Sequence, residues 1–318
     1  MNQRTVIITG ANSGIGKAAA IKFVEEGHTV IMACRNREKS EPVRASIEKQ
    51  TGNDRVHLEE VDMSSQESIR SFCGSFRSNY KKLDILIHNA AYFNHGAPYK
   101  KSPDGIEITF ATNVVGPFLM TMLLRNLLSE SDDARVLHAG SNIIKHFLSP
   151  KKEIDLKHLQ NEPENPRSHS VYVNYRNSKM ALLMLTFKMA EVFKKVGIHF
   201  YSLQINGSTM SKEALMKVKP HWRIIARIQN LFFRPPEFTA NLYYEICTSD
   251  RFRELNGVHL NHKLEVMQPA QTGKGFMTDL KQGIGVDVYP VYALNEEMIN
   301  KIWDTCRQLT DTTIETEV

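Results

Sequence analysis

Tyr175 and Lys179 lie four positions apart in a segment, 172–195, whose apolar residues recur at the spacing of a helix. Side chains at positions i and i+4 share one helix face, so we expect the phenol and the ammonium side by side. An unperturbed phenol has a pKa of about 10. A cation about 4 Å away favours the phenolate by roughly 4 kcal/mol, which lowers that pKa until burial opposes it. The pair predicts a general acid or base, although the same spacing occurs by chance on surface helices.

Two further polar side chains are candidates for the same chemistry. Ser141 ends a strand expected at 134–141, where its hydroxyl can hydrogen-bond a substrate carbonyl or simply cap the strand end. Asn113 falls inside a segment, 106–128, that has the pattern of a helix. Asparagine is a poor helix former, so Asn113 either faces solvent or bonds a specific partner.

A glycine-rich turn near the N-terminus begins the scaffold that must position these residues. The apolar run 6–8 reads as a buried strand, Gly10, Gly14 and Gly16 follow it, and an Ala-rich helix starts at once. Glycine permits the sharp turn and the close approach of a pyrophosphate, and the free N–H groups of the helix N-terminus hold the anion. The spacing differs from the usual G-x-G-x-x-G, and an ordinary strand–turn–helix is the alternative. The pattern nevertheless predicts a dinucleotide site.

The end of the second expected strand, 29–33, bears on which dinucleotide binds. An NAD site usually has an Asp or Glu here, about 20 residues after the glycines, to hold the ribose 2′-hydroxyl. This chain has Cys34-Arg35-Asn36 instead, with no acid. A guanidinium pairs bidentately with a phosphate, so Arg35 favours NADP(H) over NAD(H), unless it only solvates the strand end.

Strands and helices alternate along the 318-residue chain. We expect strands at 6–8, 29–33, 56–63, 83–91, 134–141, 197–207 and 258–260. We expect helices at 38–50, 64–80, 106–128 with an interruption at 116–117, 172–195 and from 235 to 248. This alternation requires right-handed crossovers and predicts an α/β fold, a Rossmann-like doubly wound parallel sheet in one domain with extensions.

Composition excludes several classes of function. Hydrophobic residues make up 42% of the chain, and the net charge of +5 is scattered, so we expect a sizeable core and no nucleic-acid partner. The cysteines indicate free thiols in a reducing, cytoplasmic compartment because they lie far apart, at Cys34, Cys73, Cys247 and Cys306. No apolar run reaches the roughly 18 residues of a membrane span, and no signal peptide is visible before the first strand.

Three features lie outside this pattern. Residues 145–170 are rich in Pro, Lys and Glu and indicate a loop insertion. Residues 222–233 are basic and aromatic, as in a segment that lies on a membrane surface or covers a site. His259 and His262 have a loose metal-like spacing but no supporting acid or cysteine, so we expect no metal site.

Taken together, the motifs resemble the short-chain dehydrogenase/reductase family, and within it the retinol dehydrogenase-like members. The matches follow the family's order: Thr9-Gly10-x-x-x-Gly14-x-Gly16, Asp62, Asn89-Ala90, Asn113, Ser141, Tyr175 and Lys179. The run Ala33-Cys34-Arg35-Asn36 also resembles the NADP-using retinal reductases. The resemblance implies a domain at 1–265, with the insertion at 145–170 and a substrate lid at 208–236, and a C-terminal extension at 266–318. An apolar lid there suggests a lipophilic substrate.

The resemblance implies an NADP(H)-dependent interconversion of an aldehyde or ketone and its alcohol. Tyr175 would give the proton to the carbonyl, which Ser141 would orient. Lys179 would bind the nicotinamide ribose and lower the Tyr175 pKa, and Asn113 would hold a water that joins Lys179 to solvent. Cofactor contacts are expected from Gly10, Asn12, Ser13, Gly14, Ile15, Gly16, Arg35, Asp62, Met63, Asn89, Ala90, Tyr175, Lys179, Gly207 and Thr209. A homodimer through the helix that carries Tyr175 is possible, and the extension can promote or block it.

Three departures from the family pattern leave a second interpretation open. Ala91 stands where the family has glycine, and Asn206 precedes Gly207 where the family has proline. Ser141 and Tyr175 are 34 positions apart, more than is usual in the family. The alternative function is therefore a catalytically inactive NADP-binding sensor or scaffold.

Overall fold

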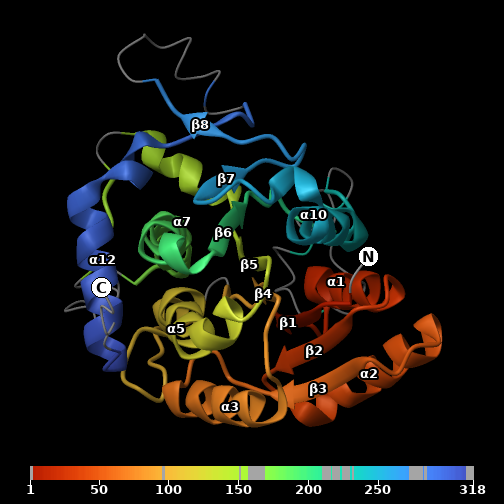
Figure 1. Cartoon of the computed structure of the whole chain (residues 1–318). Helices are drawn as coiled ribbons and strands as arrows, with labels where there is room; N and C mark the ends of the chain where they lie inside the picture. The colour runs from red at the N-terminus through yellow and green to blue at the C-terminus, as the bar shows by residue number, and fades with distance from the viewer. Residues whose placement is uncertain are drawn as a thin grey trace.

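The computed structural model of the chain describes residues 3–94, 97–149, 152–156, 169–209, 233–271 and 285–312, with the single positions 216, 223, 230 and 282 (Figure 1). The centre of the expected insertion and most of the expected lid, including the stretch 222–233 except for positions 223, 230 and 233, lie outside the described residues. The extent of both segments stays a prediction.

A parallel sheet runs through the middle of the molecule, with strand order β3-β2-β1-β4-β5-β6-β7. The strands are β1 Thr5–Thr9, β2 Thr29–Cys34, β3 Val56–Glu60, β4 Ile85–His88, β5 Ala134–Ala139, β6 Ile198–Leu203 and β7 Val258–Leu260. The expected doubly wound α/β fold is confirmed. The order reverses beside β1, whose neighbours are β2 and β4, and ligands bind at such switch points, at the carboxyl ends of the strands.

Helices cover both faces of the sheet (Figure 1). One layer consists of α1 Gly14–Glu25, α2 Arg37–Thr51 and α10 Pro236–Thr248, and the other contains α3 Gln66–Asn79, α5 Gly116–Ser129 and α7 Val171–Val192. Successive strand side chains point to opposite layers, so Ile7 packs with α3 and α5 whereas Val6 and Ile8 pack with α1. Short 3₁₀ helices complete the chain at η2 Asn142–Leu148, η4 Lys194–Val196, η5 Asp250–Phe252 and η6 Val291–Leu294.

The helix expected at 106–128 is continuous at the point where an interruption was expected. It consists of α4 Ile108–Phe110, a π-helical turn η1 Ala111–Val115, and α5. Pro117 lies in the first turn of α5 and is tolerated there. Gly116 allows close contact with the loop after β3, because an added Cβ would lie 2.2 Å from the Met63 carbonyl oxygen.

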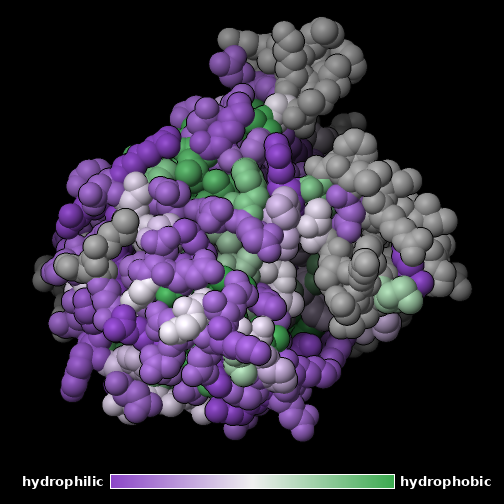
Figure 2. Space-filling model, turned by 90° about the vertical axis from the view of Figure 1, so that its right-hand side faces the viewer, coloured by the Kyte–Doolittle hydropathy of each residue, from purple (hydrophilic) through white to green (hydrophobic). Residues whose placement is uncertain are grey.

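The same stretch, Ile108–Ser129, is the one described helix that is long and apolar enough to cross a membrane by length and composition. In the fold 83% of its most apolar window is buried, where it packs against α3 and α7. This burial is that of a core helix. On the side of the molecule that carries α1 and α10, the surface is mostly hydrophilic (Figure 2).

The C-terminal extension packs on the main sheet domain. A small sheet of β8 Gln268–Pro269 and β9 Val288–Tyr289 precedes α12 Glu296–Thr310, which lies along α7 and α5 (Figure 1). Trp303 meets Phe118 edge to face at 5.2 Å between ring centroids, and Gln66 Nε2 donates to the Leu309 carbonyl at 2.7 Å. Both contacts join α12 to the core.

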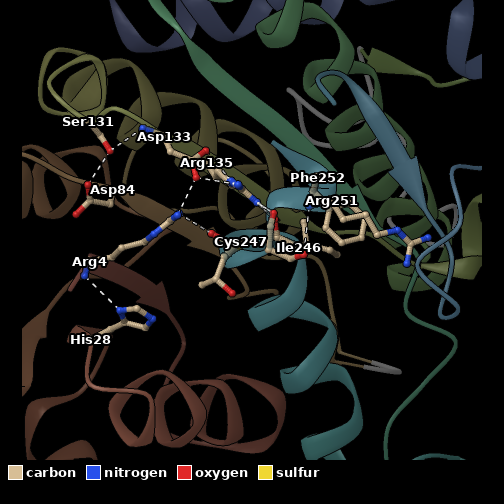
Figure 3. Close-up of polar contacts among 12 residues, drawn as sticks. Arg4, His28, Asp84, Ser131, Asp133, Arg135, Ile246, Cys247, Arg251 and Phe252 are labelled. Atoms are coloured by element: carbon tan, nitrogen blue, oxygen red, sulfur yellow. Dashed lines mark hydrogen bonds and ion pairs between the residues drawn. The ribbon is translucent and has the colours of Figure 1, made fainter. Parts of the chain in front are cut away.

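A buried polar network fixes the other end of the sheet. Arg135 Nη1 donates to the carbonyl oxygens of Ile246 and Ser249, each at 2.8 Å, and Arg4 Nη1 donates to that of Cys247 at 2.9 Å (Figure 3). Both arginines pair with Asp133 at 2.8 Å. The arginines thus satisfy the last carbonyls of α10 and tie this helix to the starts of β1 and β5.

Candidate active site

Tyr175, Lys179 and Ser141 meet beyond the carboxyl end of β5. A side-chain hydrogen bond joins Ser141 to Tyr175, and Lys179 Nζ lies 5.6 Å from the centre of the Tyr175 ring. Lys179 is only 3% exposed, and its Nζ donates to the Ala139 carbonyl at 2.8 Å. The side chains of Ser141 and Tyr175 therefore meet, although the two residues are far apart in the sequence.

The titration of this pair differs from the expectation. Burial raises the pKa of the Tyr175 phenol above its usual value, and the hydrogen bond from Ser141 opposes that rise. Burial also lowers the pKa of Lys179 to about 8. The expected lowering of the Tyr175 pKa by Lys179 is absent here, because desolvation dominates and Lys179, with a pKa of about 8, has lost its charge before the phenol ionises.

Asn113 has specific partners rather than solvent around it. Its Oδ1 accepts from the Tyr92 backbone N–H at 2.7 Å, and its Nδ2 donates to the Tyr92 carbonyl at 3.2 Å and to Ser178 Oγ at 3.0 Å. The residue is fully buried in the π-helical turn η1. Asn113 therefore joins the loop after β4 to α7, the helix of Tyr175.

The glycine turn has the geometry that its residues predicted. Gly10 has a φ of +67°, and a Cβ there would lie 3.1 Å from Ala90 Cα. A Cβ on Gly16 would lie 2.4 Å from the Gly10 carbonyl oxygen. Ser13 precedes α1 without capping it by a side-chain hydrogen bond, so the first N–H groups of that helix remain available to an anion.

A cleft of about 740 Å³ opens beside this turn, at the switch point of the sheet. Ten of the predicted cofactor residues line it: Gly10, Asn12, Ser13, Ile15, Gly16, Arg35, Asp62, Met63, Asn89 and Ala90. Gly14 and Thr209 line a neighbouring groove of about 760 Å³, and Gly207 lies in a smaller pocket of about 210 Å³. Tyr175 and Lys179 do not line the cleft, but Phe93 does, and its ring lies 4.6 Å from that of Tyr175.

Two of the predicted cofactor residues are held by the loops around the cleft. Asp62 Oδ1 accepts from the backbone and hydroxyl of Ser64 at 2.9 and 2.7 Å. Asn89 Nδ2 donates to the Thr9 carbonyl at 3.0 Å. Both side chains are thus fixed before any ligand arrives.

A second cation at the cleft was missed from the sequence. Lys39 lines the cleft together with Arg35, and both are exposed. Arg37 is turned away, since its Nη1 donates to the Leu58 carbonyl at 3.3 Å. Arg35 precedes the N-cap Asn36 and Lys39 lies in the first turn of α2, so the signal in the sequence was a second cation close behind Arg35 at the start of the expected helix.

The two departures from the family pattern have local structural explanations. Ala91 is exposed at the cleft, so its methyl group displaces no buried neighbour. Asn206 Nδ2 approaches His262 Nδ1 at 3.2 Å, and the Thr209 N–H donates to the Arg234 carbonyl at 3.0 Å.

The four cysteines are free, as expected, and all four are buried. Among the described residues no three His, Cys, Asp or Glu side chains are placed to hold a metal ion.

Comparison with known proteins adds to this geometry. The family model described as short chain dehydrogenase matches residues 4–147. Retinol dehydrogenase 11 of Homo sapiens is 31% identical over 258 residues, which cover 81% of this chain and 77% of that protein. Retinol dehydrogenase 12 of Mus musculus is 36% identical over 200 residues, 63% of this chain and 60% of that protein.

Solved structures share the fold. An uncharacterized protein from Mycobacterium paratuberculosis has a TM-score of 0.65 and 23% identity, covering 98% of this chain and 94% of that one. A short chain dehydrogenase from Shigella flexneri complexed with NADP has a TM-score of 0.62 and 21% identity, covering 83% of this chain and 98% of that one. The chain therefore belongs to the short-chain dehydrogenase family, in its retinol dehydrogenase-like branch, and is an oxidoreductase that acts on CH–OH donors.

Proposed function

We propose that the chain is an NADP(H)-dependent oxidoreductase that interconverts a lipophilic aldehyde or ketone and its alcohol, with Tyr175 as the acid and base. The observation that carries this proposal is the contact of Tyr175 with Ser141 beside a buried Lys179. A hydroxyl pair of this kind can bind one carbonyl oxygen from two sides, and the phenol can then protonate it.

The cofactor site fits a phosphorylated dinucleotide. The uncapped start of α1 offers N–H groups to a pyrophosphate, and no acidic residue occupies the first turn of that helix. Arg35 and Lys39 place two cations at the cleft where a 2′-phosphate would be held. The cleft volume of about 740 Å³ lies in the usual range for ligand sites. The bound cofactor would supply the hydride.

Two observations support a lipophilic substrate. Phe93 is 45% exposed at the cleft with its ring against that of Tyr175, so an apolar group can pack beside the acid. The curated relatives with 31–36% identity are retinol dehydrogenases by name. No described contact favours the alternative of an inactive NADP-binding sensor, and all four predicted catalytic side chains are held in place.

Titration of nicotinamide fluorescence with NADPH and NADH tests the cofactor. Replacing Arg35 or Lys39 by Ala should weaken NADPH binding by about tenfold each, since a charge-assisted hydrogen bond contributes roughly 1.5–3 kcal/mol. Binding of NADH should change little. Arg37→Ala is the matched control, because Arg37 bonds the Leu58 carbonyl instead of facing the cleft. Equal affinity for both dinucleotides would contradict the preference for NADP(H).

Turnover on a panel of lipophilic aldehydes and ketones tests the reaction. Tyr175→Phe should lower kcat by at least about 100-fold, the usual contribution of a general acid, and leave NADPH binding intact. Tight NADPH binding by the natural chain without turnover on any carbonyl would favour the sensor or scaffold instead.

We also propose a cytoplasmic location, on the ground of the four unpaired thiols. A homodimer through α5 and α7 is disfavoured, because α12 covers these helices and Trp303 packs on Phe118. Any dimer would then use another surface. Fractionation of cells and light scattering of the full chain test the two proposals.

A further inference from the structure

A row of buried polar side chains crosses the sheet directly beneath the proposed active site. His88, His138, Ser202 and His259 are neighbours in register on β4, β5, β6 and β7. Each is at most 1% exposed. Each imidazole bonds one hydroxyl, those of Thr121, Thr186 and Ser202 respectively, at 2.8–3.0 Å. The core is therefore polar at these positions, and none of these side chains takes part in the chemistry described so far.

The hydrogen bonds determine which nitrogen of His138 carries the proton. Thr186 Oγ1 donates its single hydrogen to the Leu182 carbonyl at 2.9 Å. The same oxygen lies 2.8 Å from His138 Nδ1, so it must accept from an Nδ1–H group. Burial lowers the pKa of His138 to about 3, and the ring is neutral. His138 Nε2 therefore presents a lone pair, and it has no hydrogen-bond partner among the described residues.

Lys179 is the cation that can pair with this lone pair. Its Nζ bonds the carbonyl of Ala139, the residue that follows His138, and its charge is one of the two causes that lower the His138 pKa. An ammonium has three N–H donors, and the carbonyl satisfies one of them. A buried lone pair and a buried ammonium with spare donors compensate each other where neither reaches solvent.

The other titratable groups around Lys179 supply no counter-charge at neutral pH. Tyr175 lies on the same helix, and Tyr243 on α10 lies close enough to Tyr175 for the two phenols to influence each other's pKa. His88 lies behind His138, with 5.2 Å between ring centroids. Burial raises the pKa values of both tyrosines and lowers that of His88, so all three are neutral, and desolvation alone accounts for the lowered Lys179 pKa.

We infer that His138 is a positioning residue for Lys179: its Nε2 lone pair, oriented by Thr186, serves as a second acceptor for the buried ammonium through one bridging water. This acceptor keeps Lys179 charged and directed toward Tyr175. The inference rests on the proposed role of the Tyr175–Lys179 pair, and it adds a residue of the strand beneath them to the site.

The titration of Lys179 itself can be followed without any turnover. The resonance of its ε-carbon is recorded against pH by NMR in the cofactor-free protein labelled with 13C-lysine, and it is assigned by its absence from Lys179→Met. His138→Leu removes the acceptor, so Lys179 should lose its proton at a pH lower by about one unit. His138→Asn keeps a polar acceptor and should restore most of the natural titration.

His88→Leu is the matched control, because it also removes a buried imidazole bonded to a threonine but lies one strand further from Lys179. The inference requires a shift for His138→Leu and none for His88→Leu at similar losses of thermal stability. Equal shifts, or none in either, would overturn it. If His138→Leu does not fold, Thr186→Val serves instead: it releases the Nδ1–H group and should shift the titration in the same direction.

The pH profile of alcohol oxidation gives the second readout. In His138→Leu kcat/KM should begin to fall at a pH lower by the same amount as the Lys179 titration, whereas a merely structural defect would lower the rate at every pH. Absence of turnover in the natural chain would count against the proposed function alone, since the Lys179 titration still decides the role of His138.

Discussion

Asn113 Nδ2 donates a hydrogen bond to Ser178 Oγ at 3.0 Å, and Ser178 Oγ donates in turn to the carbonyl of Tyr175 at 2.8 Å. The π-helical turn that holds Asn113 is thereby tied to the backbone of the proposed acid. Since Asn113 also binds both backbone groups of Tyr92, one side chain sets the distance between the loop after β4 and α7. That loop continues into Phe93, which lies against the Tyr175 ring.

Replacing Asn113 should therefore be costly for both stability and activity. Asn113→Leu leaves the Tyr92 N–H without its acceptor and the Tyr92 carbonyl without its donor at a partly buried position, and we expect a loss of about 2–4 kcal/mol in the free energy of unfolding. Denaturant unfolding gives this value. Ser178→Ala is the control, because it leaves only one Asn113 donor unmet and should cost about 1 kcal/mol. A smaller loss in Asn113→Leu than in Ser178→Ala would show that Asn113 does not join these segments.

Gly16 should tolerate no side chain. Gly16→Ala brings a methyl group to 2.4 Å from the Gly10 carbonyl oxygen and 2.5 Å from Asn89 Nδ2, so the turn must open. We expect destabilisation of about 1–3 kcal/mol and loss of dinucleotide binding. Gly74→Ala, in helix α3 with open space around it, should instead stabilise the chain by about 0.5–1 kcal/mol. Nicotinamide fluorescence and thermal unfolding compare the two variants, and normal binding by Gly16→Ala would refute the assigned geometry.

The charge on Lys179 should make the cofactor-free protein less stable. Its pKa of about 8 in the fold lies below the usual lysine value of 10.5, so the unfolded chain binds the proton more tightly. This cost is full below about pH 8 and disappears as pH rises toward 10.5, and it amounts to about 3 kcal/mol.

Lys179→Met should accordingly stabilise the cofactor-free protein at pH 7 and abolish turnover. The gain should shrink as pH rises toward 10, because the natural chain is by then neutral at this position. Urea unfolding of both proteins at several pH values measures it. A gain that is independent of pH would mean that the lysine is not destabilised by its charge. Lys188→Met, which removes a surface lysine paired with Glu191, should show no such trend.

The arginine network at the far end of the sheet should contribute to stability without affecting the chemistry. Arg135→Met leaves the carbonyls of Ile246 and Ser249 without their donor and Asp133 with Arg4 as its remaining partner, for a loss of about 2–4 kcal/mol (Figure 3). Chemical denaturation measures the loss, and kcat at low temperature should be nearly unchanged. Arg44→Met removes an exposed pair with Glu41 and Glu48 and should cost less than about 1 kcal/mol. Similar losses in both would contradict the assigned burial.

Much of the fold and part of the site could be predicted from local pattern. The positions of the seven strands along the chain, the glycine turn and the helix of Tyr175 followed from hydrophobic periodicity and from the conformations that only glycine adopts. Arg35 was predicted at the cleft because a strand end in this topology faces the ligand. These are properties of short segments and do not depend on contacts between distant parts of the chain.

Other features depended on segments far apart in the sequence. Lys39 was missed at the cleft, and Arg37 is directed away from it by the Leu58 carbonyl on the neighbouring strand. The partners of Asn113 come from a loop and a helix that only packing brings together. The expected break at Gly116-Pro117 does not occur: the helix continues through these two residues after a π-helical turn at 111–115, because the surrounding core holds it continuous.

The sequence by itself determined the fold class, the dinucleotide turn and the identity of the proposed acid. Only the tertiary structure decided the electrostatics of that acid. The spacing of four residues on one helix suggested that Lys179 would lower the Tyr175 pKa. Burial of both side chains instead raises the pKa of Tyr175 and lowers that of Lys179. The desolvation of Lys179 depends on all the groups around it, including His138, which lies on a strand 41 positions earlier in the sequence. The spacing of residues within one helix does not contain this information.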